Sequence, residues 1–315
     1  GKGSFVKMKK GVRIINCARG GLVDENALKE NLENGHVSSA ALDVFVNEPP
    51  KESSLLGTKN LILTPHLGAS TTEAQEKVAL QVAEQISDYL KTGAILNAVN
   101  TFSLTAKEYN SVKPYLKLCS LLGSFAGQLT ENAVKSVQVE FEGQSSNINT
   151  QPLLQTIIFS LLKPTMDNVN VINSLLVAKS KFIDVSEVKH QKQSEYQTLI
   201  KLVVTTDKQT RSVSGTLFGG KPRVVEVKGI EIDAELSNHN LYISNEDKPG
   251  FIRDLSKVLA DNKINIATFH LGRKNSGGEA IALISTDSPV DSKIVENITK
   301  IPLVIQAKYL QFNDQ

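Results

Sequence analysis

Three ionisable side chains of different kinds, Arg19, Glu48 and His66, each follow an apolar run with the length of a strand. A histidine exchanges protons near neutral pH, and a neighbouring carboxylate fixes the ring and stabilises its charged form. An arginine holds a carboxylate through two parallel hydrogen bonds. Together they suit the reversible oxidation of a 2-hydroxy acid. The histidine would take the hydroxyl proton as hydride leaves the carbon, and the arginine would anchor the acid.

Each residue alone also has an ordinary structural explanation. An arginine after a strand is commonly a surface residue, a single histidine is commonly structural, and Glu48 could be a loop residue before Pro49 and Pro50. The combination favours a site, because the elements around these residues predict a common location for them.

These elements alternate along residues 1–100. Residues 12–16, 39–45 and 61–64 read as strands, and residues 24–35 read as a helix. Near-continuous apolar strands predict a parallel sheet buried on both faces, and ligands bind at the carboxyl ends of such strands. A second helix is expected from Ser70, with Glu73 at capping-box spacing and an apolar face that includes Val78, Val82 and Ile86.

The segments INCARGGLVDE (15–25), ALDVFVNEPP (41–50) and TPHLGAS (64–70) resemble the D-2-hydroxyacid dehydrogenase family, and within it the branch that oxidises 3-phosphoglycerate. The resemblance implies a Rossmann-type α/β domain, NAD as cofactor, and 3-phosphoglycerate or a related 2-hydroxy acid as substrate, in L-serine biosynthesis. It implies that Arg19, Glu48 and His66 are catalytic. It also implies a set of residues at the nicotinamide end of the NAD site: Cys17, Ala18, Arg19, Asp43, His66, Leu67, Gly68 and Ala69.

The family's G-x-G-x-x-G turn, which holds the dinucleotide phosphates, is absent from the sequence. The nearest glycine-rich stretch, residues 215–222, lies between two alternating segments and predicts a β-turn rather than a nucleotide loop. We therefore expect a C-terminal fragment of a longer polypeptide, inactive as a dehydrogenase by itself.

Residues 236–315 show a β-α-β-β-α-β order that predicts a ferredoxin-like module. The NEDKPG turn (245–250) and residues 264–273 resemble the ACT domain, which implies an effector site and pairing between subunits. In related dehydrogenases the effector is L-serine, and the matching positions are Asn245, Asp247 and Asn265. The alternative is that Asp247 caps a turn and Asn265 begins a strand.

Three domains are therefore expected: the carboxyl-terminal part of an NAD-binding domain with its return helix (1–100), an intervening α/β domain (101–235) and an ACT domain (236–315). The middle segment resembles the intervening, allosteric substrate-binding-like domain of the longer enzymes. Some relatives have a basic anion site where this domain meets the ACT module. Lys221, Arg223 and Lys228 are the possible contributors here, although the nearby glutamates weaken that case.

The composition excludes several classes of function. The net charge of +2 argues against nucleic-acid binding, and no apolar run approaches the ~20 residues of a membrane helix. Two isolated cysteines argue against a disulfide framework or a thiolate metal site, and no metal is expected; the chain reads as cytoplasmic. We expect a homo-oligomer formed through the ACT and NAD-binding domains. The alternative function is a stand-alone amino-acid-binding regulatory protein without catalysis, which a reading frame continuing upstream would disfavour.

Overall fold

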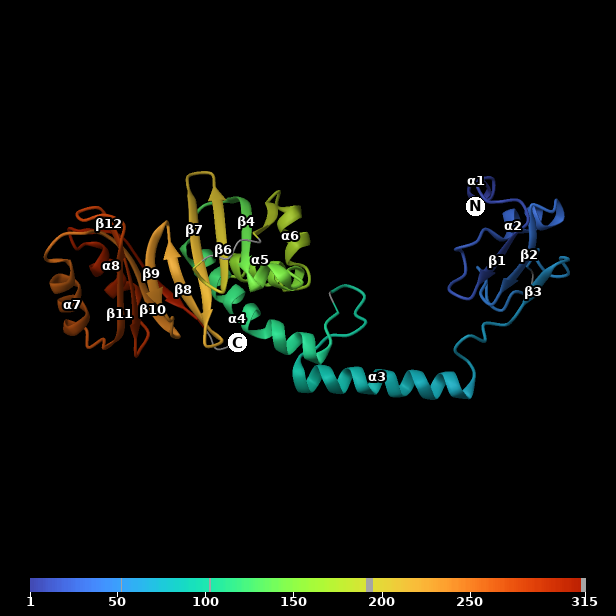
Figure 1. Ribbon diagram of the computed structural model, residues 1–315, viewed down its shortest axis with the longest axis horizontal. Helices are drawn as coiled ribbons and strands as arrows, with labels where there is room; N and C mark the ends of the chain where they lie inside the picture. Colours follow the sequence, from blue (N-terminus) through green and yellow to red (C-terminus); the bar gives the residue numbers. More distant parts are fainter. Residues whose placement is uncertain (52, 102, 191–194, 313–315) are drawn as a thin grey trace. The chain divides into compact units, whose positions relative to one another are not determined.

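The computed structural model describes residues 1–51, 53–101, 103–190 and 195–312, and it contains two compact units, Gly1–Lys91 and Thr92–Gln315 (Figure 1). Each unit is built around its own sheets and is described by itself. No helix in the described part of the chain has both the length and the apolar character that crossing a membrane requires.

The first unit is a three-stranded parallel sheet in the order β1-β2-β3. Its helix α2 begins at the N-cap Asp24, whose carboxylate accepts a hydrogen bond from Ala27 N at 2.9 Å. Leu28 and Leu32 of this helix are buried in the core of the unit. The elements are α1 (Lys2–Phe5), β1 (Val12–Asn16), α2 (Glu25–Glu33), β2 (Val37–Leu42), β3 (Leu61–Leu63) and α3 (Thr72–Thr92).

The expectation that this sheet is buried on both faces is wrong for the described structure. Val12 and Ile14 pack into the core of the unit, whereas Ile15 is 75% exposed and Ile62 is 67% exposed. Alternate residues of a strand point to opposite faces. The core therefore covers one face, and the apolar strands leave the other face open.

Helix α3 forms as expected but does not begin with the expected capping box. Its first turn is capped by Thr71, whose Oγ1 accepts from Ala74 N at 3.2 Å, while Ser70 Oγ donates to His66 O. Glu73 pairs with Lys77 instead of reaching back. No residue of α3 is buried, so its apolar stripe is exposed within the unit.

The second unit contains a six-stranded sheet in the order β5-β4-β6-β7-β8-β9, antiparallel except for the parallel pair β4–β5. Helices α4 and α5 pack on each other, and α4 also contacts β6, β7 and β8. The elements are α4 (Ala106–Leu129), β4 (Val134–Gly143), the 3-10 turn η1 (Gln144–Asn147), α5 (Gln151–Leu162), α6 (Ser174–Ser180), β5 (Asp184–His190), β6 (Thr198–Thr206), β7 (Thr210–Phe218), β8 (Lys221–Val227) and β9 (Ile230–Ala234).

The glycine-rich stretch lies between β7 and β8 and is a hairpin turn. Gly219 and Gly220 both have positive φ, 58° and 79°, as a two-residue turn with left-handed central residues requires. Phe218 pairs with Lys221 across the turn. The expected β-turn is confirmed, and the segment does not open a helix.

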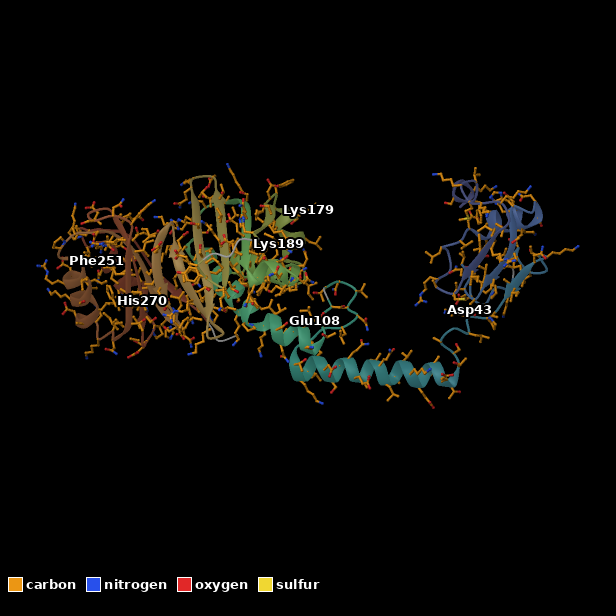
Figure 2. The ribbon with its side chains drawn as sticks, viewed as in Figure 1. Asp43, Glu108, Lys179, Lys189, Phe251 and His270 are labelled. Atoms are coloured by element: carbon orange, nitrogen blue, oxygen red, sulfur yellow. The ribbon has the colours of Figure 1, made fainter. Side chains whose placement is uncertain are left out.

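The same unit ends in a four-stranded antiparallel sheet, in the order β11-β12-β10-β13, with βαββαβ connectivity. Figure 2 labels Phe251, which starts the first helix and is buried against the sheet. The elements are β10 (His239–Glu246), α7 (Phe251–Asp261), β11 (Ile266–Arg273), β12 (Glu279–Thr286), α8 (Ser292–Thr299) and β13 (Val304–Gln311). The ferredoxin-like expectation for this region is confirmed.

The two faces of this four-stranded sheet belong to different cores. Leu241 and Ile243 pack under α7 and α8, whereas Tyr242, between them, joins the core of the six-stranded sheet and its helices. The Tyr242 ring meets the Phe125 ring of α4 edge-on, with centroids 6.0 Å apart. The carboxyl-terminal module therefore has its own core on one face of its sheet and shares a second core with the preceding domain on the other.

Candidate active site

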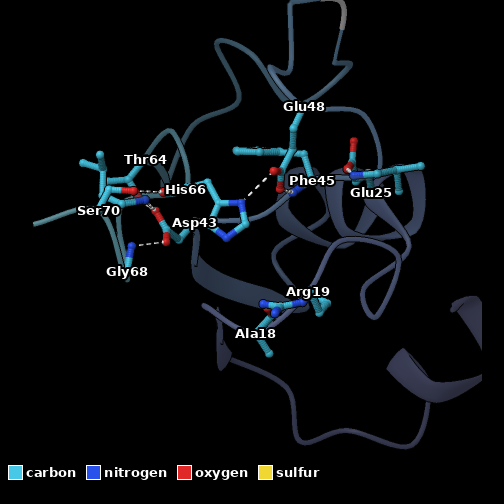
Figure 3. Close-up of polar contacts among 12 residues, drawn as sticks. Ala18, Arg19, Glu25, Asp43, Phe45, Glu48, Thr64, His66, Gly68 and Ser70 are labelled. Atoms are coloured by element: carbon cyan, nitrogen blue, oxygen red, sulfur yellow. Dashed lines mark hydrogen bonds and ion pairs between the residues drawn. The ribbon is translucent and has the colours of Figure 1, made fainter. Parts of the chain in front are cut away.

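The structure brings His66 and Glu48 together. His66 Nδ1 lies 2.6 Å from Glu48 Oε2, and both side chains are roughly half exposed (Figure 3). The other carboxylate oxygen of Glu48 accepts from Phe45 N at 3.0 Å. The hydrogen bond to His66, and then that from Phe45, holds the pKa of Glu48 below its usual range. Glu48 is thus an ionised partner that orients the imidazole.

Asp43 holds the turn on which His66 lies. It follows β2 directly and is buried, and its Oδ1 accepts from Thr64 Oγ1 at 2.6 Å and from Leu67 N at 2.7 Å. Its Oδ2 accepts from Gly68 N at 2.9 Å (Figure 3). The Thr64 hydroxyl, followed by these backbone donors, lowers the pKa of Asp43. His66 itself has the left-handed φ of 56°, so the braced turn sets the direction of its side chain.

Arg19 lies on a turn that Asn16 braces. Asn16 Oδ1 accepts from Ala18 N at 3.1 Å, and Asn16 Nδ2 donates to Arg19 O at 3.0 Å. The guanidinium of Arg19 donates to Ala18 O at 2.7 Å, and the side chain is exposed. Arg19 therefore lies just beyond the carboxyl end of β1, with its exposed guanidinium bonded to the neighbouring backbone.

Gly20 brings the Arg19 turn against the segment that leads to Glu48. A Cβ at this position would lie 1.8 Å from Phe45 O and 2.4 Å from Phe45 C, which backbone atoms cannot tolerate. The absence of a side chain thus allows the arginine turn and the glutamate loop to pack directly.

The residues expected at the nicotinamide end lie at the carboxyl edge of the strands. Cys17, Ala18, Leu67, Gly68 and Ala69 are exposed there. A dinucleotide base needs an open edge with small residues, and these exposed positions fit that need. Asp43 Oδ2 carries one hydrogen bond and keeps acceptor capacity, although the main role of Asp43 in this structure is to hold the His66 turn.

Two residues that organise this edge, Asn16 and Thr64, were not expected from the sequence as part of the site. Each is a short hydrogen-bonding residue directly beside a motif, Asn16 at the end of β1 and Thr64 just after β3. Such residues commonly bond to nearby backbone and shape turns. Their placement next to the ionisable residues was the available signal.

In the carboxyl-terminal module, the three positions matched to an effector site have different surroundings. Asn245 is buried, and its Oδ1 lacks a hydrogen-bond partner. Asp247 Oδ2 accepts from Arg273 Nη1 at 2.7 Å and from Gly277 N, and these contacts, Arg273 first, lower its pKa. Asn265 Nδ2 donates to Asp287 at 2.6 Å.

The strand register separates Asn265 from the other two residues within one chain. Asn245 pairs with Ala280 of β12, whereas Ile266, the residue after Asn265, pairs with Thr286 at the other end of that strand. Six residues of strand span about 20 Å. One small ligand cannot contact Asn245 and Asn265 of the same chain.

The three basic residues considered for an anion site are all paired with carboxylates. Lys221 pairs with Glu235, just after β9, and Arg223 pairs with Asp233 on β9. Lys228 pairs with Glu279 and lines a cavity of about 770 Å³ between the two sheets of the second unit. Lys221 and Arg223 do not line this cavity.

One group among the described residues has the side chains and spacing of a metal site. The ligand atoms of Glu140, Glu142 and His190 lie within 4.8 Å of one another, on the neighbouring strands β4 and β5. Glu140 Oε1 already accepts from Gln138, and Glu140 Oε2 lies 3.6 Å from His190 Nε2 within the group itself. The group is therefore an ordinary charged patch on the face of the sheet away from the core.

Three family models match this chain. Residues 1–68 match the D-isomer specific 2-hydroxyacid dehydrogenase NAD binding domain. Residues 111–228 match the D-3-phosphoglycerate dehydrogenase intervening domain, and residues 239–303 match the ACT domain.

Proteins similar to nearly the whole chain are D-3-phosphoglycerate dehydrogenases. That of Bacillus subtilis is 41% identical over 313 residues, which is 98% of this chain and 59% of the relative. That of Methanocaldococcus jannaschii is 36% identical over 303 residues, 96% of this chain and 58% of the relative. The chain thus spans somewhat more than half the length of these relatives. The chain therefore combines, in order, regions similar to the NAD-binding domain of the D-isomer specific 2-hydroxyacid dehydrogenases, to the phosphoglycerate dehydrogenase intervening domain and to the ACT domain.

Proposed function

We propose that this chain provides the acid–base residues and the regulatory part of an NAD-dependent D-3-phosphoglycerate dehydrogenase, which forms 3-phosphohydroxypyruvate in L-serine biosynthesis. The observation that carries the proposal is the 2.6 Å contact between His66 Nδ1 and Glu48 Oε2 beside the turn held by Asp43. Such a pair is the acid–base device that oxidation of a hydroxyl requires. The alternative, a regulatory protein without catalysis, leaves this pair unexplained.

In the proposed reaction, bound NAD would accept the hydride. Because Glu48 holds Nδ1 of His66, Nε2 is the ring nitrogen that takes the hydroxyl proton. The negative charge of Glu48 stabilises the imidazolium that forms. Arg19 binds the substrate carboxylate and polarises the developing carbonyl. The edge formed by residues 17–19 and 66–69 would hold the nicotinamide.

We assign one role to each of the three expected domains. Residues 1–100 carry the chemistry, residues 101–235 form the intervening domain, and residues 236–315 bind the effector. The family matches lie within these three ranges. We place the protein in the cytoplasm, because its two cysteines are free thiols, one exposed and one buried.

A chimera tests the catalytic proposal. The region that precedes the match in the Bacillus subtilis relative, joined to this chain, would supply the dinucleotide phosphate site. We expect NADH formation from 3-phosphoglycerate by the chimera and no activity from the chain alone. His66→Ala in the chimera should lower kcat by roughly 10²–10⁴-fold. Arg19→Ala should also raise KM, since it removes ground-state binding of the carboxylate. Near-normal turnover of folded His66→Ala would remove this histidine from the mechanism.

We also propose that the ACT module binds L-serine between two copies of the chain. The buried, unpartnered Oδ1 of Asn245 and the carboxylate of Asp247 suit the ammonium group of an amino acid. The amide of Asn265 suits its carboxylate or hydroxyl. The ~20 Å separation within one chain means that a second copy must supply Asn265 to the same serine. Binding would then link the subunits and inhibit at a distance through a coupling free energy of typically 1–3 kcal/mol.

Mixing variants tests this arrangement with the whole 315-residue chain. Asp247→Ala and Asn265→Ala should each abolish serine binding in calorimetric titration. Mixed dimers of the two variants contain one intact site, so mixing should restore binding with a reduced number of sites. If millimolar serine added to the wild-type chain gives no heat of binding in calorimetry and no NMR chemical-shift change near Asn245, the module binds another ligand or serves assembly. If the mixture of the two variants binds no serine while the wild-type chain does, the site lies within one chain.

A further inference from the structure

Glu25 is the first residue of α2, and its own helix does not use its carboxylate. The N-cap of the helix is Asp24, which already accepts from Ala27 N. A carboxylate at this position is stabilised by the positive end of the helix dipole. It is therefore an acceptor, placed on a helix, that is available to bond elsewhere.

Both oxygens of Glu25 bind the loop that carries Glu48. Oε1 accepts from Val46 N at 2.8 Å, before Glu48, and Oε2 accepts from Ser53 Oγ at 3.1 Å, after it. Figure 3 shows Glu25 beside the segment that bears Phe45 and Glu48. A single side chain thus fixes the loop on both sides of the residue that contacts His66.

The loop needs such an anchor. Its described residues between β2 and β3 form turns and bends without helix or strand. Glu48 itself bonds only within its own loop, to Phe45 N, and to the half-exposed ring of His66. Phe45 and Leu55 of the loop pack in the core of the unit, but neither hydrogen bond of Glu48 joins the loop to α2. Two side chains of α2 provide that link: Glu25 accepts from Val46 N, and the neighbouring Asn26 Oδ1 accepts from Ser54 Oγ.

We propose that Glu25 is a positioning residue for the Glu48–His66 pair. It holds Val46 and Ser53, on either side of Glu48, against α2 so that the Glu48 carboxylate meets Nδ1 of the histidine. The inference deepens the proposed function, since it assigns a new residue to the same acid–base device. Its structural part, the dependence of Glu48 on Glu25, holds or fails without reference to catalysis.

Two effects of losing Glu25 on Glu48 have opposite signs, and this makes the proposal testable. The groups that face Glu48 are His66, which lowers its pKa, and Asp43, whose charge raises it. Removing the negative charge of Glu25 would lower the pKa of Glu48 further. Freeing the loop would weaken the bonds to His66 and Phe45 and would raise that pKa toward its usual value. Positioning therefore predicts a rise, and a purely electrostatic role predicts a fall.

The experiment is a ¹³C NMR titration of the Glu48 carboxyl in the 315-residue chain, without substrate or cofactor. Glu25→Ala removes both charge and acceptors, while Glu25→Gln removes the charge and keeps an acceptor for Val46 N. Glu33→Ala, at the far end of the same helix, is the control for a change in α2. We expect the pKa of Glu48 to rise in Glu25→Ala, to stay near or below wild type in Glu25→Gln, and to be unchanged in Glu33→Ala.

An unchanged or lowered pKa of Glu48 in folded Glu25→Ala would overturn the proposal. If that variant does not fold, Ser53→Ala decides the question, because it deletes only the hydroxyl half of the anchor. A smaller rise in the same direction supports positioning, and an unchanged titration refutes it. Loss of activity in the chimera with an unchanged Glu48 titration would point to a different role for Glu25 while leaving the proposed reaction intact.

Discussion

Replacing Gly20 by alanine should separate the arginine turn from the glutamate loop. The added Cβ would lie 1.8 Å from Phe45 O, whereas ordinary contact begins at about 3.4 Å. One segment must therefore move by about 1.6 Å, because the opposing atom is backbone and cannot rotate away. Overpacking of this kind costs about 1–3 kcal/mol of stability. A 1 Å misplacement of reacting groups costs roughly 10²-fold in rate. We expect a loss of at least that size in the dehydrogenase activity of the chimera.

The neighbouring Gly21 provides a matched control. It has a φ of 80°, and a Cβ there would meet nothing within 4 Å, so alanine adds backbone strain without a clash. That strain costs about 1–2 kcal/mol. Urea denaturation of the two variants will thus give similar losses of stability and cannot separate them. The position of the loop that carries Glu48 does separate the two variants.

Amide and carboxyl NMR of the chain is the discriminating assay. In Gly20→Ala, the resonances of Phe45, Val46 and Glu48 should shift and the pKa of Glu48 should rise toward its usual value, because its bonds to Phe45 and His66 are disturbed. In Gly21→Ala these resonances should stay near their wild-type positions. If folded Gly20→Ala leaves the loop unchanged, the close packing of the two segments does not hold the site together, and the reasoning fails.

Other predictions concern the shared core and the response to acid. Tyr242→Ala should destabilise the second unit by about 3–5 kcal/mol in urea unfolding, whereas Tyr242→Phe, which keeps the edge contact with Phe125, should cost much less; equal losses would contradict this. Residues 236–315 expressed alone expose the Tyr242 face, so they should bind a hydrophobic dye and associate, and a well-dispersed monomer spectrum would refute the shared core. Asp43 and Glu48 have lowered pKa values, so their contribution to stability is present at neutral pH and is lost as pH falls through those values. Melting temperatures between pH 7 and about pH 3 should therefore fall less steeply for Asp43→Asn than for wild type.

The sequence by itself determined the features that depend on local chemistry. Apolar runs followed by Arg19, Glu48 and His66 predicted parallel strands with a site at their carboxyl edge, and the contact between Glu48 and His66 agrees with that placement. The glycine pair at 219–220 predicted a hairpin turn, because two residues with positive φ favour that conformation. The order of strands and helices in residues 236–315 predicted the ferredoxin-like module.

Tertiary structure decided what depends on register and on contacts between distant segments. The capping box at Ser70 had the right spacing, yet the hydroxyl bonds to His66 O instead, because the turn there is held by Asp43. Local pattern could not show that pairing along β12 puts Asn265 at the opposite end of the sheet from Asn245. Nor could it show that Glu25, 21 residues before Val46, anchors the loop of Glu48. The periodic spacing of apolar residues indicates which face of a helix or strand is apolar. The element that packs against that face is determined only by the tertiary structure.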